Sequence, residues 1–121
     1  MLQDDLVALM SRFRSQGLIK AGDLLLKPDA ALRLVDEVEQ MGVPIMGVDC
    51  WCYTEVDART TLSQANMVGL EIDKATLNSS RAVKDGAIQA RKFITENLPP
   101  NTIFVSLNLH IPYTWKLFPD E

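Results

Sequence analysis

The stretch 43–53, which reads VPIMGVDCWCY, is the feature of the sequence that most constrains the fold. Aromatic and β-branched residues dominate it, and its side chains follow the period of two that is typical of a β-strand. Regular alternation places two apolar sets on opposite faces, Val43, Ile45, Trp51 and Tyr53 on one and Met46, Val48, Cys50 and Cys52 on the other. Because both faces are largely apolar, the stretch is predicted to be an interior strand of a sheet. Asp49 is the exception, and a buried carboxylate there needs a hydrogen-bond partner.

Two helices are predicted before this strand and one after it. Apolar side chains recur at helical spacing from Leu6 to Phe13, and Gly17 is a natural stop. A second apolar stripe begins near Pro28, continues to Met41 and ends at Gly42. The N-capping side chains of 78–80 begin a third helix, which runs to about residue 97, shortly before a double proline.

Two further strands complete the expected fold. Residues 67–72 are predicted to form a short strand and residues 102–111 a half-buried one, whereas the polar stretch 55–64 is interpreted as a loop. Residues 24–26 form either a turn of helix or a brief strand. The expected order is helix, helix, strand, strand, helix, strand, which is an α+β fold with a small, mostly antiparallel sheet packed by helices. The 121 residues form one domain, with a less regular tail from about residue 111.

Charge and hydropathy exclude several classes of function. The formal net charge is −4 and the 12 basic residues are scattered, which argues against a nucleic-acid partner. The beginning of the chain has no basic segment followed by a long apolar run, so no signal peptide is expected. No stretch approaches the roughly 18 apolar residues of a membrane span. The expected location is therefore cytoplasmic, without a membrane partner.

Cys50, Cys52 and the single histidine, His110, are the residues with the most reactive chemistry. On a strand the two cysteines point to the same face about 6.5–7 Å apart, beyond favoured disulfide geometry, so reduced thiols are expected. Two central strands would be able to bring a cysteine near His110, which leaves a small thiol-dependent enzyme as an alternative function. Alternation, however, sends Asp49 to the face opposite both cysteines.

No cofactor or metal is expected from the sequence. Two cysteines and one histidine supply three ligands at most, whereas structural zinc sites use four. Gly42 and Gly47 lack the lysine and hydroxyl residue that end a phosphate-binding loop. Gly47 is better explained by a close backbone approach or a bulge within the strand.

Two groups of aromatic and acidic residues suit protein recognition. If the loop after the central strand returns into an antiparallel neighbour, acidic residues gather beside two aromatic rings, the set being Trp51, Tyr53, Glu55, Asp57, Glu71 and Asp73. The tail adds Tyr113 and Trp115. Aromatic anchors surrounded by acids fit a basic protein partner, since charge speeds association and aromatic burial gives affinity. The alternative is that these rings pack into the core and the acids around them are solvated.

The central run also carries a family resemblance. Val43-Pro44-Ile45-Met46-Gly47-Val48-Asp49-Cys50-Trp51, followed by a capped helix that contains Phe93-Ile94, resembles small immunity proteins of bacterial polymorphic toxin and contact-dependent inhibition systems. The likeness covers about residues 43–105, and Val48 stands where a second glycine is expected.

The resemblance implies a non-enzymatic immunity protein that binds and neutralises a cognate toxin domain with a basic surface. Such a protein would be a monomer or weak dimer. A self-associating scaffold module, joined through a sheet edge or the aromatic tail, is a further alternative.

Overall fold

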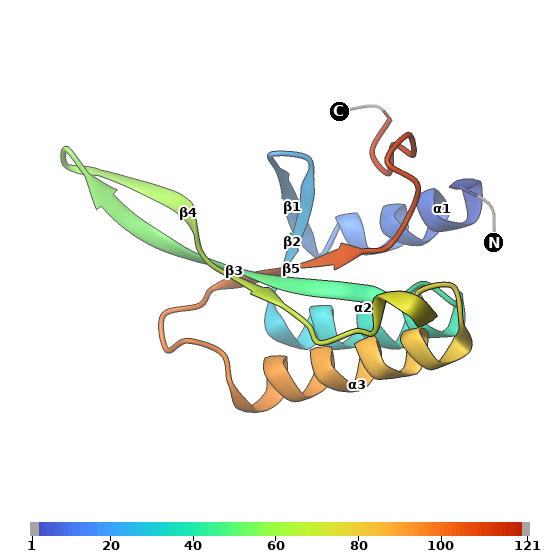
Figure 1. Ribbon diagram of the computed structural model, residues 1–121. Coiled ribbons are helices and arrows are strands. Elements are labelled where there is room, and N and C mark those ends of the chain that lie inside the picture. Colours follow the sequence, from blue (N-terminus) through green and yellow to red (C-terminus); the bar gives the residue numbers. More distant parts are fainter. Residues whose placement is uncertain (1–2, 120–121) are drawn as a thin grey trace.

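Helices α2 and α3 lie together on one side of a curled antiparallel sheet, and the long β3–β4 hairpin extends beyond them (Figure 1). The computed structural model describes residues 3–119, apart from the side chains of Val56 and Lys74. The elements are α1 (Gln3–Arg14), β1 (Gly17–Lys20), β2 (Asp23–Leu26), α2 (Pro28–Gln40), β3 (Ile45–Val56), β4 (Arg59–Gly69), the 3₁₀ turn η1 (Lys74–Thr76), α3 (Ser80–Glu96) and β5 (Phe104–Leu109).

Within residues 3–119 the sheet has five strands in the order β1-β2-β5-β3-β4, and every neighbouring pair is antiparallel. β3 pairs with β5 on one side and β4 on the other, which confirms the predicted interior strand and the α+β fold. Residues 24–26 belong to β2, so the brief strand was the correct one of the two options. Strand β1 was not predicted.

The predicted loop at 55–64 is wrong, because these residues form the end of β3, a tight turn and half of β4. Asp57 and Ala58 both have positive φ, 52° and 62°. A two-residue turn with positive φ at both central residues is a type I′ turn, and its backbone twist matches the twist of the two strands that it joins. Ala58 is an uncommon residue there, since its Cβ disfavours left-handed backbone. The turn therefore lacks the glycine that would mark it in the sequence.

A bulge near the start of β3 overturns part of the predicted alternation. The register with β5 passes from Ile45 opposite Leu109 to Gly47 opposite Asn108, which leaves Met46 as the extra residue. Ile45 and Val48 therefore share the same helix-covered core, although strict alternation separates them. The interpretation of Gly47 is confirmed, because a Cβ there would lie 2.9 Å from the carbonyl oxygen of Val68.

The helices use the apolar stripes predicted for them. The buried side chains that belong to these stripes are Leu6, Leu9, Met10 and Phe13 of α1, Ala31, Leu34, Val35 and Val38 of α2, and Val83, Ala87, Ala90 and Ile94 of α3. α3 approaches β3 so closely that a Cβ at Gly86 would lie 2.6 Å from the carbonyl oxygen of Ile45. Arg91 of α3 forms ion pairs with Asp36 and Glu39 of α2, which joins the two helices on their outer side.

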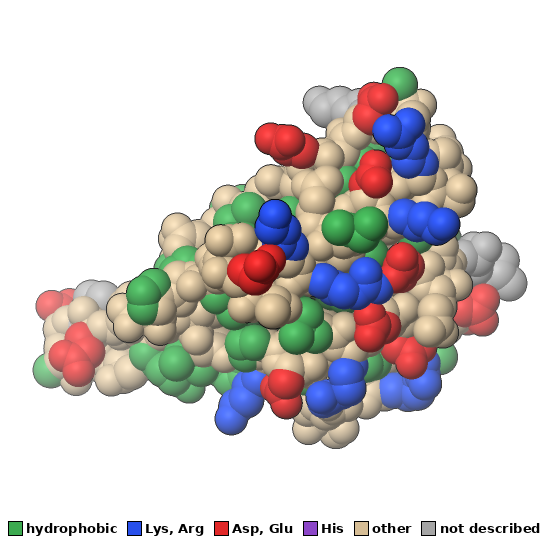
Figure 2. Space-filling view, turned by 90° about the horizontal axis from the view of Figure 1, so that it is seen from below, with side chains coloured by type: hydrophobic (Ala, Val, Ile, Leu, Met, Phe, Trp, Pro, Cys, Tyr) green, Lys and Arg blue, Asp and Glu red, His purple; other side chains and the backbone are tan. Residues whose placement is uncertain are grey.

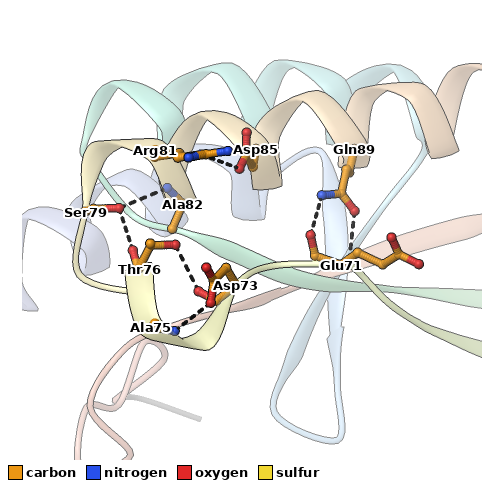
Figure 3. Close-up of polar contacts among 9 residues, drawn as sticks. All are labelled: Glu71, Asp73, Ala75, Thr76, Ser79, Arg81, Ala82, Asp85 and Gln89. Carbon is orange, nitrogen blue, oxygen red and sulfur yellow. Dashed lines mark hydrogen bonds and ion pairs between the residues drawn. The ribbon is translucent and has the colours of Figure 1, made fainter.

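The chain leaves the sheet at Gly69, earlier than the predicted strand at 67–72. Leu70 donates its backbone N–H to Met46, and the side-chain amide of Gln89 on α3 then accepts from the N–H of Glu71 and donates to its carbonyl, both at 2.8 Å (Figure 3). A helix side chain thus replaces a neighbouring strand as the partner of this backbone. Ser79 caps α3 by accepting from the N–H of Ala82, as predicted for the 78–80 segment.

The outer side of α2 and α3 carries basic and acidic side chains interspersed with one another (Figure 2). Several form exposed ion pairs, such as Arg33 with Asp29 and Arg81 with Asp85. Such pairs contribute little to stability, and interspersed positive and negative charges do not create an electrostatic field of one sign.

Among the described residues, no helix combines the length and apolar character that crossing a membrane requires.

The positive φ of Ala58 predicts that Ala58→Gly stabilises the protein. Removing the Cβ relieves left-handed strain, and after the entropy that glycine adds to the unfolded chain we expect a gain of about 0.5 kcal/mol or more in the free energy of unfolding. Urea titration measures the change. Ala8→Gly in the exposed face of α1 is the matched control and should destabilise by about 0.5–1 kcal/mol. Equal destabilisation by both substitutions would contradict the turn geometry.

Candidate protein-binding surface

The β3–β4 hairpin has an outer part that no other described strand supports. β5 pairs with β3 only as far as Trp51, opposite Phe104, while β3 and β4 continue pairing to Val56 and Arg59. We call residues 52–64 the hairpin arm. It extends past β5 and the helices as a two-stranded ribbon (Figure 1). An isolated two-stranded ribbon is only marginally stable in water and is stabilised when another element packs against it. The exposed faces of this arm are therefore suited to contact with a partner.

The two faces of the arm differ in chemistry. Cross-strand neighbours share a face. Tyr53 lies opposite Leu62, and Met67 lies opposite Asp49 on the same face, four pairs closer to the body. Tyr53 is 55% exposed and Met67 is 74% exposed. We call Tyr53, Glu55, Leu62 and Met67 the hairpin face; these residues lie on the side of the sheet away from α2 and α3. The other face of the arm is polar, with the hydroxyl groups of Thr54 and Ser63 hydrogen-bonded at 2.9 Å.

The same side of the sheet is buried and polar where the arm meets the body. Trp51 is only 4% exposed, and its indole N–H donates to the hydroxyl of Ser106 at 3.0 Å. The side-chain amide of Asn108 donates to the carboxylate of the buried Asp49 at 3.1 Å. The partner expected for a buried Asp49 is therefore a side chain of β5. Burial raises the pKa of Asp23 on β2, and the negative charge of Asp49 raises it further.

Only part of the predicted binding set lies together. Trp51 is a core residue rather than an exposed anchor, so that expectation is wrong. Tyr53 and Glu55 lie on the hairpin face, with the exposed Asp57 at the tip. The interpretation of 55–64 as a loop hides Leu62, and the prediction of a separate short strand at 67–72 does not reveal that Met67 lies opposite Asp49. The β-formers Thr60, Thr61 and Leu62, adjacent in an otherwise polar stretch, are the sequence signal for a strand there.

The predicted acidic rim does not form. Glu55 and Asp57 lie at the tip of the arm, whereas Glu71 and Asp73 follow the other end of β4. The eleven residues of β4 span about 35 Å, and that length separates the two pairs. Asp73 instead caps the short 3₁₀ turn, accepting from the N–H of Ala75 at 2.9 Å (Figure 3).

The aromatic residues of the tail lie elsewhere on the molecule. Trp115 packs half-buried against the core and lines a hollow with Ile19 and Gly22 at the β1–β2 hairpin. Tyr113 is 97% exposed. Both follow the end of β5 opposite to the end that pairs with Trp51, so the tail and the hairpin face lie at opposite ends of that strand. They form two separate surfaces.

The cysteines and His110 are not brought together. Cys50 lies opposite Val105, and His110 is five residues further along, which corresponds to roughly 17 Å on a strand. The backbone N–H of His110 donates to Pro44. Cys50 and Cys52 are both free thiols, and Asp49 lies on the opposite face, as alternation predicts. Burial raises the pKa of the Cys50 thiol, a hydrogen bond with Thr102 lowers it, and the charge of Asp49 raises it, with a net increase.

The remaining candidates for binding chemistry are weak. Within residues 3–119, no three side chains of His, Cys, Asp or Glu gather closely enough to hold a metal ion. A hollow of about 530 Å³ lies between the end of α2 and the beginning of α3, lined by Pro44, Leu77, Val83, Lys84 and His110 among others.

Comparison of the chain with protein-family models, curated proteins and solved structures found no match in any of the three.

The environment of Asp23 predicts a specific pH dependence. Because the pKa of Asp23 is raised in the folded state, that state binds more protons than the unfolded state between the unfolded pKa of about 4 and the higher folded pKa, and stability falls as pH rises through this window. Asp23→Asn removes this loss and should stabilise the protein at pH 7 more than at pH 3. Urea unfolding at both pH values measures the difference, with Asp57→Asn at the exposed tip as a charge-matched control. An Asp23→Asn effect that is the same at both pH values would rule this out.

The buried thiol of Cys50 predicts slow alkylation. A raised pKa leaves little thiolate at neutral pH, so Cys50 should react with iodoacetamide roughly tenfold or more slowly in the native protein than in urea. Peptide mass mapping follows Cys50 and Cys52 separately. Labelling of native Cys50 as fast as in the unfolded chain would instead support the thiol-dependent enzyme.

Proposed function

We propose that this protein acts by stoichiometric binding to another protein through the hairpin face and the tip of the arm. The observation that carries the proposal is a hairpin that exposes an aromatic ring and two acids on its projecting arm and the thioether of Met67 nearer the body, with no described element covering them. Tyrosine and methionine are enriched at protein interfaces, since they bury large areas at modest entropic cost. Exposed carboxylates of Glu55 and Asp57 favour a basic surface on the partner.

The partner that fits best is a toxin domain of a bacterial polymorphic toxin system, which makes this chain an immunity protein. The resemblance over about residues 43–105 supports this reading, and those residues include the whole β3–β4 hairpin. The net charge of −4 suits a basic toxin surface by favouring rapid association. In this proposal the protein is located in the cytoplasm and neutralises the toxin there by covering it. In the thiol-dependent alternative His110 would serve as the base, but it lies five residues, roughly 17 Å, along the chain from the residue opposite Cys50.

The test is co-expression with the toxin domain encoded beside this protein's gene. We expect rescue of growth and a one-to-one complex of the two chains on size exclusion. The double variant Tyr53→Ala, Met67→Ala should weaken binding by roughly tenfold to a hundredfold, measured by calorimetry, because truncation removes the anchors of the face.

Ile88→Ala is the matched control, since Ile88 is 59% exposed but lies on α3. It should leave the affinity unchanged. Absence of a complex together with failure to rescue growth would overturn the immunity function. A complex weakened by Ile88→Ala but not by the double variant would overturn the assignment of the hairpin face.

A further inference from the structure

The hairpin face continues across the sheet as a row of side chains that reaches the β1–β2 hairpin. Met67 on β4 lies opposite Asp49 on β3, and the side-chain amide of Asn108 on β5 donates to the carboxylate of Asp49 at 3.1 Å. Asp23 lies on β2, the next strand beyond β5. It alternates with Leu24, which belongs to the helix-covered core, so Asp23 points to the same side of the sheet as Asp49. The charge of Asp49 accordingly acts on the carboxyl group of Asp23.

The charged side chains that the strands place on this side are mostly of one sign. β3 contributes Asp49 and Glu55, and β2 contributes Asp23. Lys20 on β1 lies opposite Asp23 and is the one cation that the described strands place here, but among the ion pairs of residues 3–119 none joins the two. The outer side of α2 and α3, in contrast, carries both signs interspersed (Figure 2). The side away from the helices therefore has a net negative field, which a basic surface complements.

Asp23 is the acid of this side whose charge is least compensated. Its side chain is half-buried, and its carboxylate has no hydrogen-bond or ion-pair partner within the described part of the chain. Burial raises the pKa of Asp23, and the charge of Asp49 raises it further, so the ionised form is disfavoured in the folded protein. Asp49 is buried more deeply, but it accepts a hydrogen bond from Asn108. A cation beside Asp23 would offset the charge of both carboxylates.

We propose that the partner bound by the hairpin face carries a basic side chain, arginine or lysine, that reaches past Met67 to the carboxylate of Asp23. This inference rests on the proposed function and adds a second point of contact to it. Six residues of β3 lead from Asp49 to Glu55, which is about 20 Å along the strand. The partner therefore needs two basic patches roughly 20 Å apart, one for the arm and one for the base of the hairpin, with an apolar patch between them for Tyr53 and Met67.

The substitution Asp23→Asn tests the contact, because its expected effects on folding and on binding have opposite signs. At pH 7 it should stabilise the isolated chain, since it removes a disfavoured charge. It should weaken the complex with the toxin domain encoded beside this protein's gene by roughly tenfold or more, because the partner's cation loses its anion. Calorimetry at low and high salt measures the second effect. Added salt should weaken the wild-type complex more than the variant complex.

Asp85→Asn is the matched control, because it removes the same charge from the outer side of α3, where Asp85 pairs with Arg81. It should leave the affinity for the toxin domain unchanged. Equal weakening by Asp85→Asn and Asp23→Asn would overturn the inference, since the partner would then respond to net charge rather than to a contact at Asp23.

Proton release on binding is a readout that a merely structural role of Asp23 would not move. A cation beside Asp23 lowers its raised pKa, so complex formation just above the ordinary carboxyl pKa of about 4 should release protons. Calorimetry in two buffers of different ionisation enthalpy measures this release, and Asp23→Asn should abolish it. A complex whose affinity and proton release are the same with Asp23→Asn would overturn the inference and leave the proposed function in place.

Two further outcomes identify other failures. Absence of any complex would overturn the proposed function, and this inference with it. Stabilisation of the isolated chain by millimolar Ca²⁺, removed by Asp23→Asn, would assign the two carboxylates to a metal ion and overturn the partner's basic side chain as their occupant.

Discussion

The difference in length between β3 and β5 determines most of this structure. β3 has twelve residues and β5 has six, so only the first half of β3 lies at the centre of the sheet. That half is buried by α2 and α3 on one side, and α3 packs against its backbone at Gly86. Beyond Trp51 the second half pairs with β4 and with no other strand of residues 3–119, and it becomes the hairpin arm. One continuous strand therefore supplies both the most buried and one of the most exposed parts of the protein.

The side of the sheet away from the helices shows how the body supports the arm. Where β3 leaves β5, Trp51 is buried and hydrogen-bonded to Ser106, and Asp49 is held by Asn108. Satisfied buried polar groups fix one arrangement, because any other leaves a donor or acceptor unpaired. The arm is thus anchored in a defined direction at its base. Burial, and next the charge of Asp49, raise the pKa of Asp23, so the ionised form of Asp23 is disfavoured in the folded protein.

The sequence predicts the parts of the fold that depend on long apolar patterns. The three helices and the interior strand follow from such patterns, and Gly42 marks the end of α2 with its positive φ of 78°. The arm could not be predicted in this way, because both of its faces are exposed and its turn contains Ala58 rather than glycine. The bulge at Met46 moved Ile45 to the face of Val48, which no count of alternating residues reveals. Errors in the binding set follow from these two points: Trp51 was assigned to the surface, and Glu71 to the wrong end of the hairpin.

The hairpin face exists only while β3 and β4 stay paired, because its residues come from both strands. Tyr53 lies opposite Leu62 and Asp49 lies opposite Met67, and directly paired residues place their side chains on the same side of the sheet. Side chains project perpendicular to a sheet, which keeps this face separate from the backbone groups that hold the two strands together. A partner that covers the face therefore contacts both strands at once and also stabilises their pairing.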